Sequence, residues 1–207
     1  MPSILDSRDQ IKKIDKSNLL GSVEALSQQI EDALSQTKSI QVDESYKTGI
    51  KNVVVAGMGG SVLASYIIKN LYKSELQVPF EVVSHYDLPS YVNEDSLVIL
   101  SSYSGTTEEV LAAAKQKKKK KAKIMAIASG GPLLNLAKKH TWPVYKIEPN
   151  FNPSKQPRLA IGYAVVGQLM LLSHAGLLPD LSNVLKVVSN NLAKMVRELS
   201  PETTDNI

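Results

Sequence analysis

The sequence predicts an α/β fold built on a five-stranded parallel sheet that helices cover on both faces. Five short runs rich in valine and isoleucine, bounded by glycine, proline, serine or aspartate, have the length and flanks of strands. Stretches with helical spacing of apolar residues alternate with them. Because the runs are continuously apolar, both faces of the sheet should be buried, which is typical of a parallel sheet.

The first expected element is an amphipathic helix over residues 18–35. Its apolar residues recur at spacings of three and four and so share one helical face: Leu19, Val23, Leu26, Ile30 and Leu34. We expect this face to pack on the flank of the core.

The sheet region follows, with strands expected at residues 52–56, 80–84, 96–101, 123–128 and 143–147. The helices expected between them cover residues 61–72, 107–116 and 132–139. Acids directly after Thr107 and the proline at position 132 are typical of helix starts. The link at 85–95 is expected to be a short helix or irregular.

A proline-rich polar segment at 148–158 then interrupts the alternation. It is expected to be a loop, and long ordered loops in compact domains are often functional. Two helices should follow, at 159–175 and 181–199, the first ended by Gly176 and the second by Ser200-Pro201.

Composition narrows the class of protein. With 207 residues and 43% apolar content, the chain suits one domain with appendages. The absence of cysteine excludes disulfides, cysteine-based metal sites and a thiol nucleophile. The N-terminus has acids where a signal peptide has basic and apolar regions, and no apolar run is long enough to cross a bilayer. We therefore expect a cytoplasmic protein without membrane contact.

The formal net charge of +4 comes from one lysine-rich run. Seven lysines lie within residues 115–123, and without them 17 basic residues stand against 20 acidic ones. At the end of an expected helix these lysines complement the helix dipole, and contact with a polyanion is the alternative. Because no aromatic residues interleave with them, we expect no nucleic-acid partner. The three histidines lack metal-ligand spacing, so no metal site is expected.

Two serine-rich turns predict a site for a phosphorylated small molecule. Gly57-Met58-Gly59-Gly60-Ser61 follows one expected strand, and Ser101-Ser102-Tyr103-Ser104-Gly105-Thr106-Thr107 follows another. Glycines let the backbone approach an anion, hydroxyls donate to phosphate oxygens, and a following helix N-terminus adds N–H groups. Ligands of parallel sheets bind at the carboxyl ends of the strands, where both turns should lie. The alternative is that both are turns and helix caps without a ligand.

These turns, together with Ala128-Ser129-Gly130-Gly131 and Pro157-Arg158, resemble the sugar isomerase (SIS) domain. More narrowly, they resemble the bifunctional phosphoglucose/phosphomannose isomerase family, in order and spacing over essentially the whole chain. The resemblance implies a doubly wound, flavodoxin-like SIS fold with flanking N- and C-terminal helices. One departure is Thr106, at a position where the family usually has asparagine.

The resemblance also implies roles for single residues. The phosphate ligands that it implies are Ser102, Ser104 and Thr107, and the residues that line the sugar are Gly59, Gly60 and Ser61. Arg158 is implied to be catalytic, stabilising the cis-enediolate that forms when C2 loses its proton. A guanidinium suits that role because it stays charged and offers donors in a fixed fork. The alternative is a surface arginine beside a helix start, where the dipole does not favour a cation.

The implied reaction interconverts glucose 6-phosphate, and mannose 6-phosphate, with fructose 6-phosphate without a cofactor. It requires ring opening and a general base that moves a proton between C1 and C2. In the family a glutamate is the base and a histidine opens the ring, the first from a second SIS domain and the second from a dimer partner. Both would lie beyond this sequence, which is therefore expected to be the N-terminal half of an isomerase. The alternative is a non-catalytic sugar-phosphate-binding or sensor module.

The expected organisation has four parts. Residues 1–40 form a helical segment that packs on the core, and residues 41–158 form the SIS domain with its active-site loop. Residues 159–200 form the C-terminal helices, and residues 201–207 begin a linker to a second SIS domain that the sequence does not contain. A homodimer is implied, with the helices after residue 159 as candidates for its interface.

Overall fold

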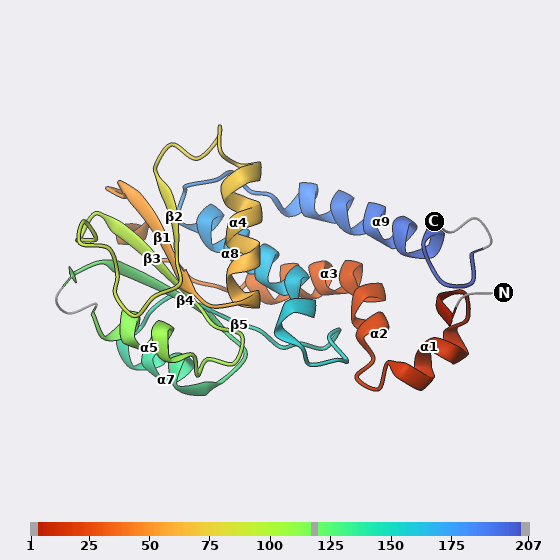
Figure 1. Ribbon diagram of the computed structural model, residues 1–207. Helices are drawn as coiled ribbons and strands as arrows, with labels where there is room; N and C mark the ends of the chain where they lie inside the picture. The colour runs from red at the N-terminus through yellow and green to blue at the C-terminus, as the bar shows by residue number, and fades with distance from the viewer. Residues whose placement is uncertain (1–3, 117–119, 204–207) are drawn as a thin grey trace.

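Five parallel strands form one sheet in the order β2-β1-β3-β4-β5 (Figure 1). The computed structural model describes residues 4–116 and 120–203. The strands are β1 Asn52–Gly57, β2 Phe80–Val83, β3 Ser96–Ser101, β4 Lys123–Ala128 and β5 Val144–Lys146. Every expected strand is thus confirmed, with small shifts at the ends.

Helices connect the strands and cover them. The α-helices are α1 Arg8–Ile14, α2 Leu19–Glu24, α3 Leu26–Thr37, α4 Gly60–Leu71, α5 Glu108–Lys115, α7 Gly131–His140, α8 Ile161–His174 and α9 Ser182–Glu198. Short 3-10 turns lie at η1 Ile4–Asp6, η2 Glu44–Tyr46 and η3 Pro157–Leu159. The link at 85–95 is irregular. Among the residues placed here, no helix is both long and apolar enough to cross a membrane.

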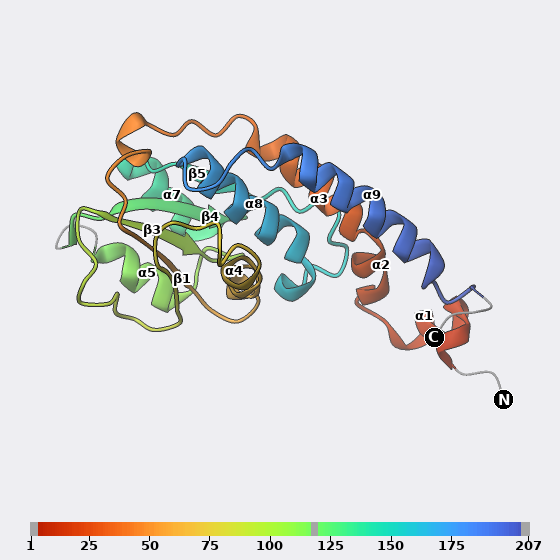
Figure 2. The same ribbon diagram turned by 90° about the horizontal axis from the view of Figure 1, so that it is seen from above.

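Each strand buries alternate residues on opposite faces of the sheet. Val53 and Val55 of β1 pack toward α3, α4 and α8, whereas Val54 and Ala56 pack toward α5 and α7. Figures 1 and 2 show these two helical layers on either side of the sheet. Two separate hydrophobic cores result, and the doubly wound arrangement expected from the sequence is confirmed.

The strand order reverses between β1 and β3, which lie side by side at the centre of the sheet. From β1 the chain crosses to β2 on one flank, and from β3 it crosses to β4 on the other. Gly57 and Ser101, the last residues of β1 and β3, are paired in the register. The connections leave a crevice at such a point, where ligands of open α/β sheets bind.

The N-terminal helical segment departs from expectation. The single helix expected over 18–35 is two helices, α2 and α3, which meet at Ala25 (φ −82°, ψ 5°). The Gln29 carboxamide of α3 donates to the Ser22 carbonyl of α2 at 3.3 Å. The break therefore lets one buried side chain hold both helices.

The expected apolar stripe is buried only in its second half. Ile30 and Leu34 lie in the core between α3 and α8, but Leu19 and Val23 are exposed. The expectation was wrong for these two residues because α2 lies beside the sheet's carboxyl edge, where they line a pocket described below.

Helix α9 packs along α3 and carries the chain away from the sheet (Figures 1 and 2). The short helix α1, which the sequence did not predict, lies near its far end. Arg8 of α1 donates to Glu24 at 2.6 Å and to Glu202 at 2.5 Å, and these bonds raise the pKa of Arg8 above its usual range. Residues 117–119 of the lysine-rich run and 204–207 of the expected linker lie outside the described residues.

Candidate functional site

Three turns meet at the carboxyl edge of the sheet. The first turn (residues 57–61) joins β1 to α4, the second turn (residues 101–107) joins β3 to α5, and the third turn (residues 128–131) joins β4 to α7. The three strands are neighbours, so their ends bring the turns together. Both serine-rich turns expected from the sequence lie here.

Ser61 connects the first turn to the second. Its hydroxyl accepts a hydrogen bond from the Tyr103 N–H at 3.1 Å, and its carbonyl accepts from the Ser101 hydroxyl at 3.0 Å. The hydroxyl proton of Ser61 takes no part in the bond to Tyr103. Ser61 therefore fixes the first turn against the second, and its hydroxyl proton can still be donated to a ligand.

The serines of the second turn have different surroundings. Ser102 is only 1% exposed, its hydroxyl lies 2.7 Å from that of Thr107, and it accepts from the Gly105 N–H at 3.0 Å. Ser104 is exposed and its hydroxyl lies 2.8 Å from that of Thr106. Ser102 thus stabilises the turn from its buried side, whereas Ser104 faces solvent.

Helix α5 begins directly after these hydroxyls. Among the described residues, no group accepts a hydrogen bond from the N–H of Glu108 or of Glu109. Unpaired amides at a helix N-terminus carry a partial positive charge. Together with the hydroxyls of Ser104 and Thr107, they are suited to an anion.

The third turn packs backbone to backbone against the second. The Ser129 hydroxyl donates to the Tyr103 carbonyl at 2.7 Å, and the Leu133 N–H donates to the Gly105 carbonyl at 3.1 Å. A Cβ atom on Gly105 would lie 1.9 Å from the Gly130 carbonyl oxygen. These contacts explain why this corner of the site is built from glycines.

Arg158, which the sequence places far from both serine turns, lies against the first turn. A Cβ atom on Gly60 would lie 3.0 Å from the Arg158 backbone nitrogen. By contrast, Gly59 has a φ of +54° and open space where a Cβ would be, which leaves its backbone accessible to a ligand. Arg158 is exposed, and no carboxylate among the described residues forms an ion pair with its guanidinium.

A pocket of 650 Å³ opens between Arg158 and the first turn. Its lining residues are Ser17, Leu19, Leu20, Val23, Gly59, Gly60, Gln156, Pro157, Arg158 and Leu159. None of these is an acid or a histidine, so the pocket's only formal charge is that of Arg158. The volume and the single cation suit a small anionic or polar ligand.

Gln29 holds the turn that bears Arg158. Its carboxamide is fully buried, donates to the Leu159 carbonyl at 2.8 Å and to the Phe151 carbonyl at 3.0 Å, and accepts from the Gly162 N–H at 3.2 Å. Sequence reasoning missed this residue because a glutamine in an amphipathic helix is usually a surface residue. No pattern in the sequence marks it.

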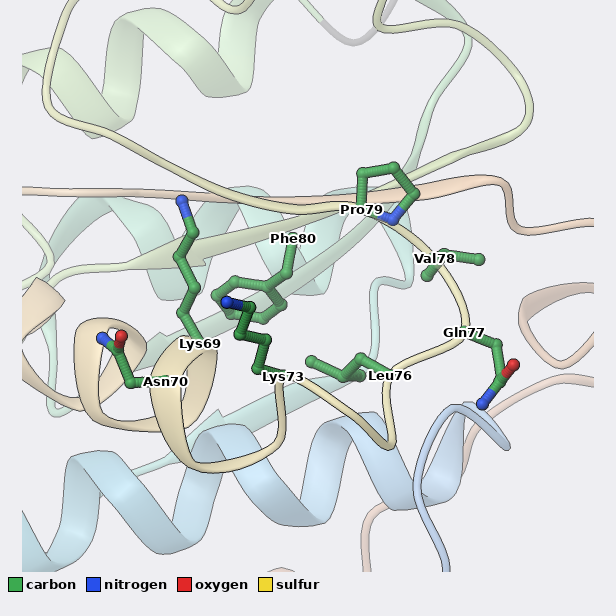
Figure 3. A pocket seen from close by; sticks show the side chains of 8 residues that line it. All are labelled: Lys69, Asn70, Lys73, Leu76, Gln77, Val78, Pro79 and Phe80. Atoms are coloured by element: carbon green, nitrogen blue, oxygen red, sulfur yellow. The ribbon is translucent and has the colours of Figure 1, made fainter.

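A second pocket, of 530 Å³, lies at the opposite edge of the sheet (Figure 3). It is formed by the end of α4, the following turn and the start of β2, and Lys69 and Lys73 extend beside Phe80. Lysines at the C-terminal end of a helix complement its dipole. Their position is therefore explained without a ligand, and the pocket is remote from the three turns.

The histidines do not come together. His85 is exposed after β2, His140 stacks on Trp142 with ring centroids 5.2 Å apart, and His174 ends α8. Over residues 4–116 and 120–203, no cluster of three His, Cys, Asp or Glu side chains could hold a metal ion.

Comparison with known proteins agrees with this geometry. The SIS domain family matches residues 48–177. The chain is 35% identical over 184 residues to a protein of Caldicellulosiruptor bescii named bifunctional phosphoglucose/phosphomannose isomerase, covering 89% of this chain and 53% of that one. A protein of Thermoplasma acidophilum with the same name is 35% identical over 164 residues, covering 74% of this chain and 49% of that one. The chain thus spans about half the length of these relatives.

A solved structure with the same fold is the Vibrio vulnificus NanR protein complexed with ManNAc-6P. It superposes with a TM-score of 0.53 at 15% identity and covers 92% of this chain and 70% of that one. At this identity the likeness concerns the fold alone. The family match covers the sheet, the three turns and Arg158, and the chain therefore belongs to the SIS domain family.

Proposed function

We propose that this chain is the sugar-phosphate-binding part of an aldose–ketose isomerase, which interconverts glucose 6-phosphate, and mannose 6-phosphate, with fructose 6-phosphate. The observation that carries the proposal is the convergence, at one edge of the sheet, of a turn that presents hydroxyls and unpaired N–H groups with an arginine outside any ion pair of the described residues. Relatives that bear the name of this activity support it.

In this proposal the second turn holds the phosphate group. The ligands are Ser102, Ser104 and Thr107, aided by the free N–H groups that begin α5. Because Ser102 is buried and its hydroxyl lies beside that of Thr107, it also orients Thr107. Hydrogen bonds from neutral donors to a charged phosphate are stronger than those between neutral groups.

The sugar lies between the first turn and Arg158. Gly59 and Gly60 permit a close approach to its hydroxyls, and Ser61 offers its remaining donor. When C2 loses its proton, negative charge develops on the oxygens at C1 and C2. The Arg158 guanidinium stabilises that cis-enediolate with charge and with donors in a fixed plane.

The proton then moves from C2 to C1, and the hydroxyl proton on the C2 oxygen passes to the C1 oxygen. Substrate and product are isomers of the same overall oxidation state, so the scheme needs no redox cofactor. The step requires a base, and ring opening requires a second acid–base group. No carboxylate or imidazole lines the pocket among the described residues. We therefore place the base glutamate on a second SIS domain and the ring-opening histidine on a dimer partner, as the resemblance implies.

Each part of the chain has its own place in the proposed enzyme. Residues 41–158 form the sugar-phosphate domain, residues 1–40 and 159–200 are helical additions to it, and residues 201–207 begin a linker. The protein acts as a cytoplasmic homodimer without a nucleic-acid partner. Exposed apolar residues on α9, including Val184, Val187 and Val188, support an interface on that helix.

A non-catalytic sugar-phosphate sensor is the second candidate. The pocket observation favours it, because the described part of the chain provides an oxyanion-stabilising group without a base. Binding would then occur without turnover.

Ser104→Ala tests the phosphate site. Binding of a phosphorylated aldonate, whose carboxylate resembles the enediolate, is followed by calorimetry, and fructose 6-phosphate formation is measured separately. We expect the variant to bind about tenfold or more weakly, since a hydrogen bond to a charged group contributes roughly 1.5–3 kcal/mol. Ser74→Ala, on an exposed serine beyond the far end of α4, is the matched control and should bind like the natural chain.

The outcomes separate the candidates. Binding that depends on Ser104 together with turnover supports the isomerase, and the same binding without turnover supports the sensor. Equal binding by Ser104→Ala and Ser74→Ala would contradict the assignment of the second turn as the phosphate site.

A further inference from the structure

A partly buried hydrogen bond links the second turn to the loop that bears Arg158. Tyr103 belongs to that turn, but its partly buried ring packs against the core shared with α8, and its hydroxyl lies beside Asn152. There it accepts a hydrogen bond from the Asn152 side-chain amide at 3.1 Å. The two residues are 49 positions apart in the sequence.

Every polar group of the Asn152 side chain has a partner. The residue is 3% exposed, and its amide nitrogen donates to the Gln156 carbonyl at 3.1 Å as well as to Tyr103. Its side-chain oxygen accepts from the Ser154 hydroxyl at 2.9 Å, and Ser154 is itself bonded to the Ser22 hydroxyl at 2.8 Å. A network that pairs every polar atom of a buried side chain favours one geometry of that side chain.

The network ends on the turn that carries Arg158. The Gln156 carbonyl that Asn152 binds also accepts from the Leu159 N–H at 3.1 Å, which closes η3 around Arg158. Gln29 binds the Leu159 carbonyl on the other side of this turn. Asn152 therefore holds one end of η3 and, through Tyr103, connects it to the phosphate-binding turn.

We propose that Tyr103 and Asn152 are positioning residues that couple the second turn to Arg158. When the second turn holds the phosphate of a sugar, the coupling then fixes the distance between the Arg158 guanidinium and the other end of that sugar. The inference rests on the proposed function, because it needs one ligand that reaches both places. The coupling favours ligands that carry a phosphate and an anionic centre together over ligands that carry phosphate alone.

Tyr103→Phe tests the coupling in the 207-residue chain. It removes one hydroxyl and leaves Asn152 bonded to Gln156. We expect affinity for the phosphorylated aldonate to fall about fivefold, as for loss of one hydrogen bond of ordinary strength. Affinity for inorganic phosphate, which fills the second turn alone, should stay within about twofold.

Tyr145→Phe is the matched control. It also removes a tyrosine hydroxyl with one side-chain partner, which donates to Gln36 at 3.1 Å on the α3 side of the sheet. Both ligands should bind this variant as they bind the natural chain. Amide hydrogen exchange at Leu159, whose N–H donates to the Gln156 carbonyl, should rise in Tyr103→Phe and not in Tyr145→Phe.

A double-mutant cycle shows whether Tyr103 acts through Arg158. Arg158→Lys keeps the positive charge but loses the planar fork. In that background, Tyr103→Phe should cost no further aldonate affinity, because the group that it positions is already absent. If Tyr103 had a purely structural role, Tyr103→Phe would lower the aldonate affinity by the same factor in both backgrounds.

Three results would overturn the inference. They are an equal loss of affinity for phosphate and aldonate, an additive loss in the Arg158→Lys background, and unchanged binding and exchange in Tyr103→Phe. If the natural chain binds neither ligand, the proposed function fails as well. If it binds both and the losses are additive, only the coupling fails.

Discussion

Gly105 lies at φ +70° in the second turn, and a Cβ atom on it would approach the Gly130 carbonyl oxygen to 1.9 Å. A side chain at this position would therefore be destabilising for two reasons: the backbone is left-handed, and the Cβ atom would clash with the backbone of Gly130. We expect Gly105→Ala to lower the free energy of unfolding by about 2 kcal/mol or more and to abolish aldonate binding. Denaturant unfolding and calorimetry measure the two effects.

Gly49→Ala isolates the cost of the left-handed backbone. Gly49 has nearly the same backbone conformation, φ +71°, but open space where the new Cβ would lie. This control should lose only about 1–2 kcal/mol of stability and keep its affinity for the aldonate. If the two variants behaved alike, the packing of the second turn on the third would not determine the site.

The residues of the second turn could be predicted from the sequence, but their orientation could not. Ser102, Ser104 and Thr107 are predicted together as phosphate ligands, and the structure brings them into one turn but buries Ser102. Which hydroxyl faces solvent depends on the packing of the turn against its neighbours. A pattern of serines and glycines identifies the turn without giving that orientation.

At the scale of elements, α8 ends in a histidine whose charge affects stability. Burial lowers the pKa of His174 below its ordinary value of 6.5, and Lys47 lowers it further, against the opposite effect of Asp180. The folded chain therefore binds this proton less readily than the unfolded chain does. Stability is retained above pH 6.5 and falls as the pH drops below it toward the folded-state pKa.

His174→Gln should remove this dependence. Between pH 7 and pH 5 we expect the natural chain to lose about 1.4 kcal/mol for each unit by which the pKa is lowered, and the variant to lose less. Denaturant unfolding at a series of pH values measures both. If the free energy of unfolding fell equally with pH in the two proteins, another group would be responsible for the loss of stability between pH 7 and pH 5.

The elements themselves are predicted well where periodicity is strong. All five strands and the helices between them agree with the sequence, because an apolar run of strand length or a helical stripe is a local property. The interval 18–35 is predicted less well, since no local pattern marks the break at Ala25, after which Gln29 contacts groups from three separate segments.

At the scale of the whole molecule, α9 presents an apolar face that no described segment covers. Val187 is 58% exposed on this face, whereas Leu185 and Ser189 on the opposite face are buried toward α3. In the proposed homodimer, we expect Val187→Asp to weaken self-association about tenfold or more, because the interface on α9 would bury a charge. Sedimentation at micromolar concentrations measures the change.

Asn190→Asp is the control for this prediction. It adds the same charge to an exposed position on α9 without removing an apolar side chain. It should associate like the natural chain. A natural chain that sediments as a monomer would contradict an interface on α9 while leaving the site unaffected.

The fold class, the two serine turns and the family can be predicted from the sequence, because they depend on local periodicity and on short motifs. The contact of Arg158 with Gly60, and the connection that Tyr103 and Asn152 make between the second turn and the Arg158 loop, are evident only in the folded chain. Such contacts join segments far apart in the chain, and their geometry follows from how the helices pack on the sheet. No local pattern encodes that packing, which is why the predicted residues became one site only in the folded chain.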